Sequence, residues 1–279
     1  MDINRHIDIM GIVNLTDDSY FAQSRCGEVS AALKRIETLA DEGATVIDLG
    51  ACSTRPGSLP VGAEEEWRRL KPVLEAVAAA RSGICLSIDT CWSDVVRKSY
   101  DLIGDFIVND ISSGEDDPAM LPLVGRLGLR YVAMHKRGTP QTMQSLTDYK
   151  DVVGDVLTYF NSFAHKAFEN GIKDWILDPG FGFAKTIGQN YNLLSRLSDF
   201  KKAFPASKNG EHDSYIIPKI LVGVSRKSMV YRLFDITPEE SLPATQVLHL
   251  AALQNGADIL RVHDVAEALR TLAIYRRLV

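Results

Sequence analysis

Cysteine is scarce in this 279-residue sequence, and long apolar runs are missing. The four cysteines, Cys26, Cys52, Cys85 and Cys91, show no Cys-x-x-Cys spacing, which argues against a disulfide-stapled scaffold or a zinc ribbon. No apolar run approaches the roughly 20 residues that a membrane-spanning helix needs, and the first residues lack the apolar core of a secretory signal. We therefore expect a cytoplasmic protein with reduced thiols and no membrane partner.

Positive charge and clustered metal ligands are also lacking. The formal net charge is −5 and no basic stripe offsets it, so the composition predicts no nucleic-acid partner. The six histidines are scattered, which argues against a structural zinc, and no Gly-x-Ser-x-Gly motif offers a nucleophile. Any anion site must therefore be local, and its chemistry must rely on positioning and electrostatics.

What the sequence does contain is a regular alternation of two patterns. Segments with helical spacing, such as residues 63–83 and 151–171, separate short apolar runs rich in β-branched residues. There are eight of these runs, at residues 6–14, 43–50, 84–90, 106–112, 130–135, 174–180, 219–225 and 258–264. Nearly continuous apolar strands are typical of parallel sheets covered by helices. Eight such repeats predict a (β/α)8 TIM barrel that forms a single domain over residues 1–279, with a doubly wound open sheet as the alternative.

Polar side chains gather after the predicted strands, where a barrel has its active site. Asn14, Asp89, Asn109 and Asp178 each stand at or just past the end of an apolar run. A barrel would aim all four at one central mouth. Because carboxylates accept hydrogen bonds from ring N–H and amino groups, and amides both donate and accept, this set suits an aminopyrimidinone-like heterocycle.

Basic side chains come from other strand ends, namely Arg55, Arg226, Lys227, Arg261 and His263. Ser225 and Ser228 flank two of these cations, and a helix is predicted to begin at once. The positive end of that helix would add to an anion site. Asp264 is expected to cap the last helix. The longer polar stretch of residues 204–218 is placed on the opposite face and given no function.

In order and spacing, these motifs resemble the dihydropteroate synthase family nearly from end to end. The matching stretches are MGIVNLTDDSY, STRPG, SIDT, VNDISSG, MHKRGTPQTMQ, DPGFGFAKT, VGVSRKS and RVHDV. Each is weak alone, but the ordered set is specific. The resemblance implies a (β/α)8 barrel, in agreement with the repeats, and a homodimer that sulfonamide drugs target.

The resemblance also implies a transferase of folate biosynthesis. Such an enzyme condenses 6-hydroxymethyl-7,8-dihydropterin pyrophosphate with p-aminobenzoate to give 7,8-dihydropteroate and pyrophosphate. Departure of pyrophosphate, assisted by Mg²⁺, would come first, and the aniline nitrogen would then attack. No enzyme nucleophile is needed on this route, in keeping with the lack of a candidate.

Carried over by matched position, the resemblance implies a role for each candidate residue. The residues expected to hydrogen-bond the pterin are Asp89, Asn109, Asp178 and Lys227, with Arg261 stacked on it. Those expected to hold the pyrophosphate are Asn14, Arg261 and His263, with Asn14 also near Mg²⁺. Thr54 and Arg55 would close over the phosphates and the aminobenzoate pocket, and Ser228 would receive the aminobenzoate carboxylate.

The chain departs from the family pattern at a few positions. Asp17 replaces a proline, residues 20–25 replace a glycine-rich continuation, Ala51-Cys52 replaces Gly-Glu, and Ala184 replaces a glycine. None of these changes removes a matched ligand, but the first loop could close differently. Two alternatives remain at this point. A methyltetrahydrofolate-dependent methyltransferase would need no pyrophosphate site, and a non-catalytic pterin-binding barrel would have lost turnover.

Overall fold

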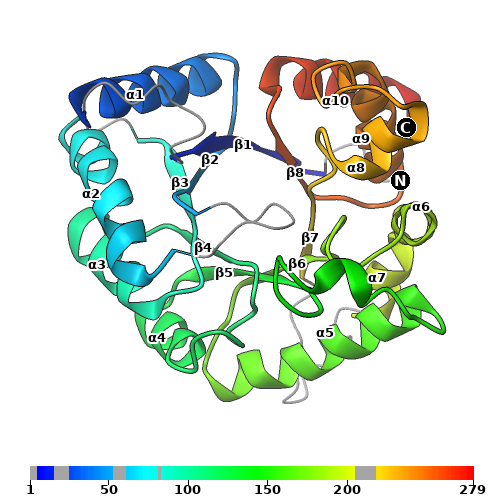
Figure 1. The fold of residues 1–279 in the computed structure, drawn as a ribbon, viewed down its shortest axis with the longest axis horizontal. Coiled ribbons are helices and arrows are strands. Elements are labelled where there is room, and N and C mark those ends of the chain that lie inside the picture. Colours follow the sequence, from blue (N-terminus) through cyan, green and yellow to red (C-terminus); the bar gives the residue numbers. More distant parts are fainter. Residues whose placement is uncertain (1–4, 16–24, 53–60, 81–82, 205–217) are drawn as a thin grey trace.

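In the computed structural model, the described part of the chain forms a closed barrel of eight parallel strands surrounded by helices (Figure 1). The structure describes residues 5–15, 25–52, 61–80, 83–204 and 218–279. The strands are β1 (Asp8–Asn14), β2 (Val46–Gly50), β3 (Cys85–Asp89), β4 (Ile107–Asp110), β5 (Arg130–Met134), β6 (Trp175–Asp178), β7 (Lys219–Val222) and β8 (Ile259–Val262). Each strand pairs with the next, and β8 pairs with β1. The predicted single-domain (β/α)8 TIM barrel is therefore confirmed, and the open-sheet alternative is wrong.

The helices form a ring outside the strands (Figure 1). They are α1 (Arg25–Asp41), α2 (Ala63–Ala80), α3 (Ser93–Ile103), α4 (Met120–Leu127), α5 (Val152–Glu169), α6 (Ile187–Ser195), α7 (Ser198–Ala203), α8 (Ser228–Phe234), α9 (Leu242–Gln254) and α10 (Val265–Leu278), with a 3₁₀ turn, η1 (Met143–Ser145). Side-chain caps fix where two of these helices begin. The Asp151 side chain caps α5 by accepting from the Val153 N–H at 3.2 Å, and Thr186 and Gln189 form a capping box at α6.

Two separate apolar layers hold the barrel together. The larger lies between strands and helices, and the smaller fills the barrel interior with one side chain from most strands. The interior residues are Met10, Val46, Ile107, Val132, Ile176, Leu221 and Ile259, all of them buried. This layer separates two polar ends. We call the carboxyl ends of the strands the mouth and their amino ends the floor.

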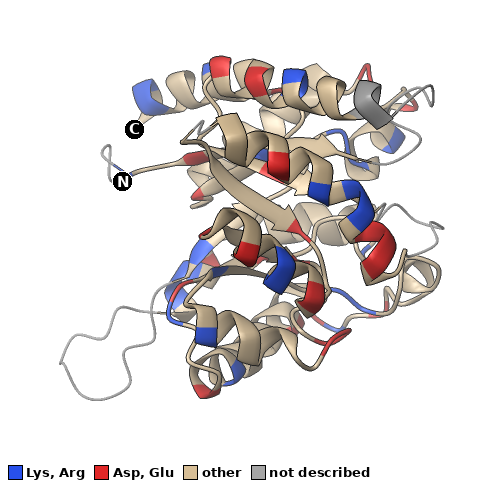
Figure 2. Ribbon diagram, turned by 90° about the vertical axis from the view of Figure 1, so that its left-hand side faces the viewer, with Lys and Arg blue, Asp and Glu red and all other residues tan. Residues whose placement is uncertain are grey.

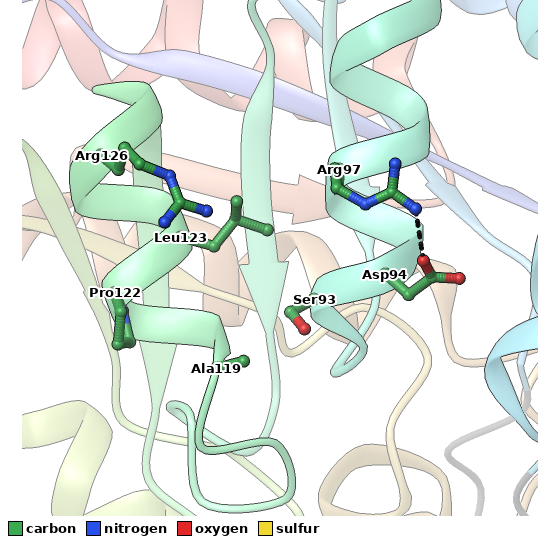
Figure 3. Close-up of a pocket in the computed structure, with 7 residues that line it drawn as sticks. All are labelled: Ser93, Asp94, Arg97, Ala119, Pro122, Leu123 and Arg126. Carbon is green, nitrogen blue, oxygen red and sulfur yellow. Dashed lines mark hydrogen bonds and ion pairs between the residues drawn. The ribbon is translucent and has the colours of Figure 1, made fainter.

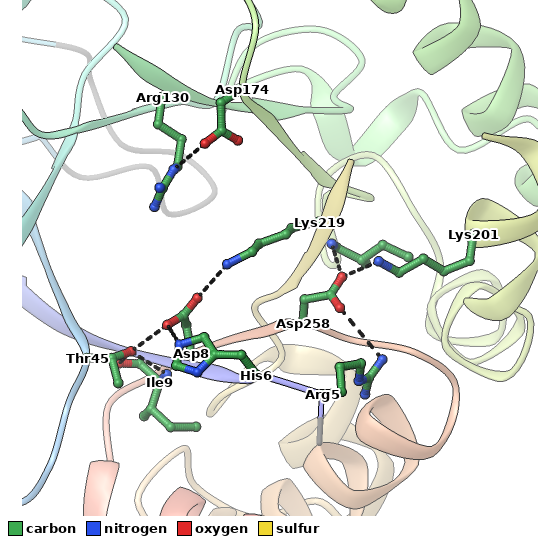
Figure 4. A network of polar contacts seen from close by, with 11 residues as sticks. Arg5, His6, Asp8, Ile9, Thr45, Arg130, Asp174, Lys201, Lys219 and Asp258 are labelled. Atoms are coloured by element: carbon green, nitrogen blue, oxygen red, sulfur yellow. Dashed lines mark hydrogen bonds and ion pairs between the residues drawn. The ribbon is translucent and has the colours of Figure 1, made fainter. Parts of the chain in front are cut away.

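A network of ion pairs occupies the floor (Figure 4). The Asp8 carboxylate accepts hydrogen bonds from Lys219 Nζ at 3.0 Å and from Thr45 Oγ1 at 3.2 Å, and it lies 2.9 Å from His6 Nε2. Asp258 pairs with Lys201 in the same region. Phe204 and Pro218, the ends of the predicted excursion, also lie on this side, whereas residues 205–217 fall outside the described residues.

Charges of both signs are interspersed along the outer helices in the view of Figure 2. Among the described residues, no helix combines the length and the apolar character that crossing a membrane would require.

Candidate active site

The alternation of side chains along the strands builds the mouth. Residues two apart on a strand face the same side, so a polar residue two positions beyond an interior apolar one also points into the barrel. Four strands follow this rule, with the pairs Val46 and Asp48, Ile107 and Asn109, Ile176 and Asp178, and Ile259 and Arg261. Strand register places Gly50 between Asn14 and Asp89. Within the described residues, the mouth is therefore lined by carboxylates, amides and the guanidinium of Arg261.

Arg261 is the centre of this lining. Its guanidinium lies 2.6 Å from Asp48 Oδ2 and 2.9 Å from Asp89 Oδ2, and the Asn109 amide donates to Asp48 at 3.1 Å. One cation thus serves two carboxylates, of which Asp48 is fully buried. Burial raises the pKa of Asp89 to about 7, although Arg261 opposes the shift. Asp89 can therefore change protonation near neutral pH, as residues of functional sites often do.

Lys227 and Asp178 face each other on the β6–β7 side of the mouth. Lys227 Nζ donates a hydrogen bond to the Phe181 carbonyl and lies 4.9 Å from the centre of the Phe183 ring. Burial lowers the pKa of Lys227 to about 8, with Asp178 opposing, and burial raises the pKa of Asp178, with Lys227 opposing. Each residue therefore stabilises the charge of the other in a site from which water is largely excluded.

His263 directly follows β8 and contacts a serine from the loop after β7. Its Nδ1 lies 3.1 Å from Ser225 Oγ. Burial, and then the charge of Arg261, lower the pKa of His263 to about 4, so the imidazole is neutral near pH 7. It can act as a hydrogen-bond partner for an anion, but it adds no positive charge.

Two sequence predictions near this histidine need correction. Arg226 was grouped with the cations of an anion site, but its guanidinium is engaged by Asp264 through two contacts of 2.6 and 2.9 Å. Asp264 stands at the start of α10 as expected, yet its side chain makes no capping hydrogen bond. The fork geometry of a guanidinium and a carboxylate outcompetes a cap.

Asn14 offers an oxygen at the rim of the mouth. A Cβ added at Gly50 would lie 3.7 Å from Asn14 Oδ1 and 3.5 Å from Asp89 Cβ, so the glycine keeps the space between these side chains open. Within the described residues, no group of three His, Cys, Asp or Glu side chains could hold a metal ion. A lone amide oxygen fits Mg²⁺ bound mainly by substrate phosphates and water, because Mg²⁺ keeps few protein ligands.

Comparison with known proteins agrees with this geometry. A family model described as pterin binding enzyme matches residues 10–263. The dihydropteroate synthase of Escherichia coli (strain K12) is 37% identical over 271 residues, which cover 96% of this chain and 90% of the relative. The chain belongs to the dihydropteroate synthase family. The methyltransferase alternative is thereby set aside.

Solved structures of dihydropteroate synthases match the whole chain. That of Yersinia pestis with a sulfonamide drug complex superposes with a TM-score of 0.86 at 34% identity and covers 100% of this chain and 95% of its own. That of Xanthomonas albilineans with 4-aminobenzoic acid gives 0.86 at 33% identity and covers 100% and 94%.

Most residues to which the dihydropteroate synthase resemblance assigns a role lie in the described part of the chain. Those placed at the mouth are Asn14, Asp89, Asn109, Asp178, Lys227, Arg261 and His263, and Ser228 begins α8. Thr54 and Arg55, and with them Asp17 and residues 20–24, lie outside the described residues. The positions at the strand ends are as predicted, while the assigned roles stay predictions.

Sequence reasoning does not single out several buried charged residues, of which Asp48 and Lys185 bear on the mouth. Asp48 touches both Arg261 and Asn109, and Lys185 lies within the β6–α6 turn that also contacts Lys227. Asp48 left a signal, because a carboxylate in the middle of a buried strand has to be paired. Lys185 lies within the quoted motif DPGFGFAKT, but nothing local indicates which groups its ammonium reaches.

A cavity of 120 Å³ adjoins the mouth, with Cys52, Glu66, Asp89 and Cys91 in its wall. Burial raises the pKa of the Cys52 thiol, which is partly buried as a filler would be and is not activated. A groove of 410 Å³ lies instead on the outside of the barrel between α3 and α4, beside Arg97 (Figure 3). It includes none of the mouth residues, so the mouth remains the candidate active site.

Proposed function

We propose that this chain catalyses the dihydropteroate synthase reaction at the barrel mouth. The reaction joins 6-hydroxymethyl-7,8-dihydropterin pyrophosphate to p-aminobenzoate and releases pyrophosphate. The observation that carries the proposal is the cluster of the buried Asp48 with the partly buried Asp89 and Arg261, because family membership alone does not supply a competent site. A pterin presents a planar face and an edge of N–H and amino donors, and this cluster offers a guanidinium plane and carboxylate acceptors.

The pterin is proposed to bind with its edge toward the carboxylates. Asp89, Asn109 and Asp178 would accept from, or donate to, its ring and amino groups, and Lys227 would donate to a ring acceptor. Arg261 is held by Asp48 and Asp89, so its plane is fixed before a substrate arrives. Fixed donors and acceptors lower the barrier because they need no reorganisation during the reaction.

Pyrophosphate departure is proposed at the rim, where Asn14, Arg261 and His263 lie. Thr54, Arg55 and Ser228 are assigned to the phosphates and the aminobenzoate by sequence match. When bound, Mg²⁺ would supply charge neutralisation for the leaving pyrophosphate, with Asn14 as its protein ligand. The chain's own part is to hold the aniline nitrogen and the exocyclic carbon of the pterin in line.

The proposal extends to partners and compartment. A homodimer is supported by the exposed apolar side chains of Val247 on α9 and of Ile274 and Leu278 on α10, two helices that pack together. Relatives are solved with sulfonamides, so we propose that such drugs bind here as well. The thiols of Cys85 and Cys91 form no disulfide, in keeping with a cytoplasmic location.

The test is an assay of pyrophosphate release. Both substrates are supplied with Mg²⁺, and release that depends on p-aminobenzoate is expected. Tight pterin binding without release would instead favour the non-catalytic pterin-binding barrel. Absence of both binding and release would remove the proposal altogether.

A further inference from the structure

Lys185 is a buried lysine at the edge of the mouth that the reaction does not use. It is 4% exposed, and its Nζ donates to the Gly180 and Phe183 carbonyls at 2.9 Å each and lies 3.0 Å from His135 Nδ1. An ammonium carries three N–H donors, so these three acceptors satisfy it. Two of the acceptors belong to the same short turn between β6 and α6. Lys185 therefore links the two ends of that turn through its ammonium group.

The opposite side of this turn meets the active site. The carbonyl of Phe181, between the two that Lys185 binds, accepts a hydrogen bond from Lys227. The turn packs closely on the end of β5, because a Cβ at Gly180 would lie 2.0 Å from the His135 carbonyl, and Gly182 lies beside Lys227, whose Cδ would be 3.4 Å from an added Cβ. A single turn thus presents the Gly180 and Phe183 carbonyls to the buried Lys185 and the Phe181 carbonyl to Lys227 at the mouth.

We propose that Lys185 is a positioning residue for Lys227. By holding the Gly180 and Phe183 carbonyls, it fixes the orientation of the Phe181 carbonyl and hence the place of the Lys227 ammonium. Lys185 itself touches no substrate. The inference rests on the proposed function only in taking Lys227 as a pterin ligand.

The charges around Lys185 set the conditions for a test. His135 and Arg137 face it from the end of β5 and the loop beyond, Asp178 from β6, and Lys227 from the loop after β7. Burial lowers the pKa of Lys185 to about 7, with Asp178 opposing and the two cations adding to the shift. Binding is therefore measured at pH 6, where the ammonium form is present.

The experiment measures binding of 6-hydroxymethyl-7,8-dihydropterin pyrophosphate by calorimetry, without p-aminobenzoate. Lys185→Met should weaken binding about tenfold, because the buried charged hydrogen bonds that shape the turn are lost. Lys185→Gln keeps an N–H donor and should bind with intermediate affinity. Lys201→Met, an equal change at the floor, should bind as the wild type does.

A double-mutant cycle separates positioning from general damage. Adding Lys185→Met to Lys227→Met should weaken binding less than twofold further, since the group to be positioned is already gone. A full additional tenfold loss, or a loss in Lys185→Met no larger than in Lys201→Met, would overturn the inference. If Lys185→Met does not fold, unchanged affinity in Lys185→Gln overturns it equally. Failure of the wild type to bind the pterin would instead count against the proposed function.

Discussion

The two ends of the barrel use the same kinds of side chain in opposite proportions. At the floor, acids have several partners each, since Asp8 meets Lys219 and His6, and Asp258 meets Lys201 and Arg5 (Figure 4). At the mouth, a single guanidinium is shared by Asp48 and Asp89. Among the described residues, each floor acid thus meets two basic side chains, whereas the two mouth acids share one guanidinium.

The pKa values respond accordingly. Although burial opposes it, the hydrogen bonds from Lys219 and His6 hold the pKa of Asp8 below its ordinary value. Burial raises the pKa of Asp89 to about 7 against the pull of Arg261. A carboxylate with few hydrogen-bond donors from its own protein can accept hydrogen bonds from the N–H groups of a ligand. The difference in pKa between Asp89 and Asp8 therefore indicates that the mouth is the end that binds a ligand.

The backbone shows the same contrast. Turns entering the strands at the floor place glycine at positive φ, as at Gly43 and Gly256, with φ of 102° and 105°. Loops leaving strands at the mouth also place glycines there, such as Gly180, and in addition three residues with a Cβ, namely Ser113, Ala184 and Arg226, with φ of 51–53°. Residues with a Cβ are strained in this region, and such strain tends to collect at functional sites.

The largest expected effect comes from removing a mouth cation. Lys227→Ala should lower kcat/KM roughly a thousandfold, because a partly buried donor proposed to bind the pterin is lost. Lys219→Ala, its counterpart at the floor, should leave turnover within about twofold of the wild type. Aminobenzoate-dependent pyrophosphate release measures both. Near-normal turnover in Lys227→Ala would contradict the placement of the pterin and erase the functional distinction between the ends.

A smaller effect is expected on stability. Asp48→Asn should lower the free energy of unfolding by about 2 kcal/mol, because the buried Asp48 loses the charge that it brings to two contacts with Arg261. Asp8→Asn should cost about 1 kcal/mol, because its main partner Lys219 is 40% exposed. Urea unfolding of the two variants gives the comparison. Equal losses would mean that Asp48 at the mouth contributes no more to the free energy of unfolding than Asp8 at the floor.

The strand ends could be predicted from sequence because strand geometry is periodic. Once Ile107 and Ile176 are read as interior, Asn109 and Asp178 must face the same interior two residues later. Asp48 follows the same rule after Val46, although it lies within an apolar run that by itself indicates only a buried strand.

Partners distant in the chain could not be predicted in this way. Arg226 meets Asp264 across 38 residues, and Lys185 meets His135 across 50. Such pairs depend on how the loops after different strands fold over one another, and no local pattern encodes that. The roles of Thr54 and Arg55 rest on family resemblance alone.

The pH dependence of stability should have opposite signs for an acid at the mouth and an acid at the floor. Because the folded-state pKa of Asp89 is raised to about 7, the folded protein holds a proton that the unfolded chain releases near pH 4. Stability contributed by this group is therefore lost as pH rises from about 4 to 7. Asp8, with its lowered pKa, contributes stability that is present above about pH 4 and is lost as pH falls.

Urea unfolding without substrates measures both slopes. As pH rises from about 4 toward 7, the free energy of unfolding of the wild type should fall relative to that of Asp89→Asn. As pH rises toward and past about 4, the free energy of unfolding of the wild type should increase relative to that of Asp8→Asn. Parallel curves for the wild type and Asp89→Asn between pH 4 and 7 would remove the electrostatic contrast.

The smallest effect concerns strain at the mouth. Ala184 replaces a family glycine, is fully buried and has φ of 51°, so Ala184→Gly should raise the free energy of unfolding by roughly 0.5–1 kcal/mol. The relief of Cβ strain exceeds the entropy that glycine adds to the unfolded chain. Gly180→Ala in the same turn should do the reverse, because its Cβ would lie 2.0 Å from the His135 carbonyl. The midpoint of urea unfolding reports both, and a lower midpoint for Ala184→Gly would mean that the methyl group packs better than its backbone is strained.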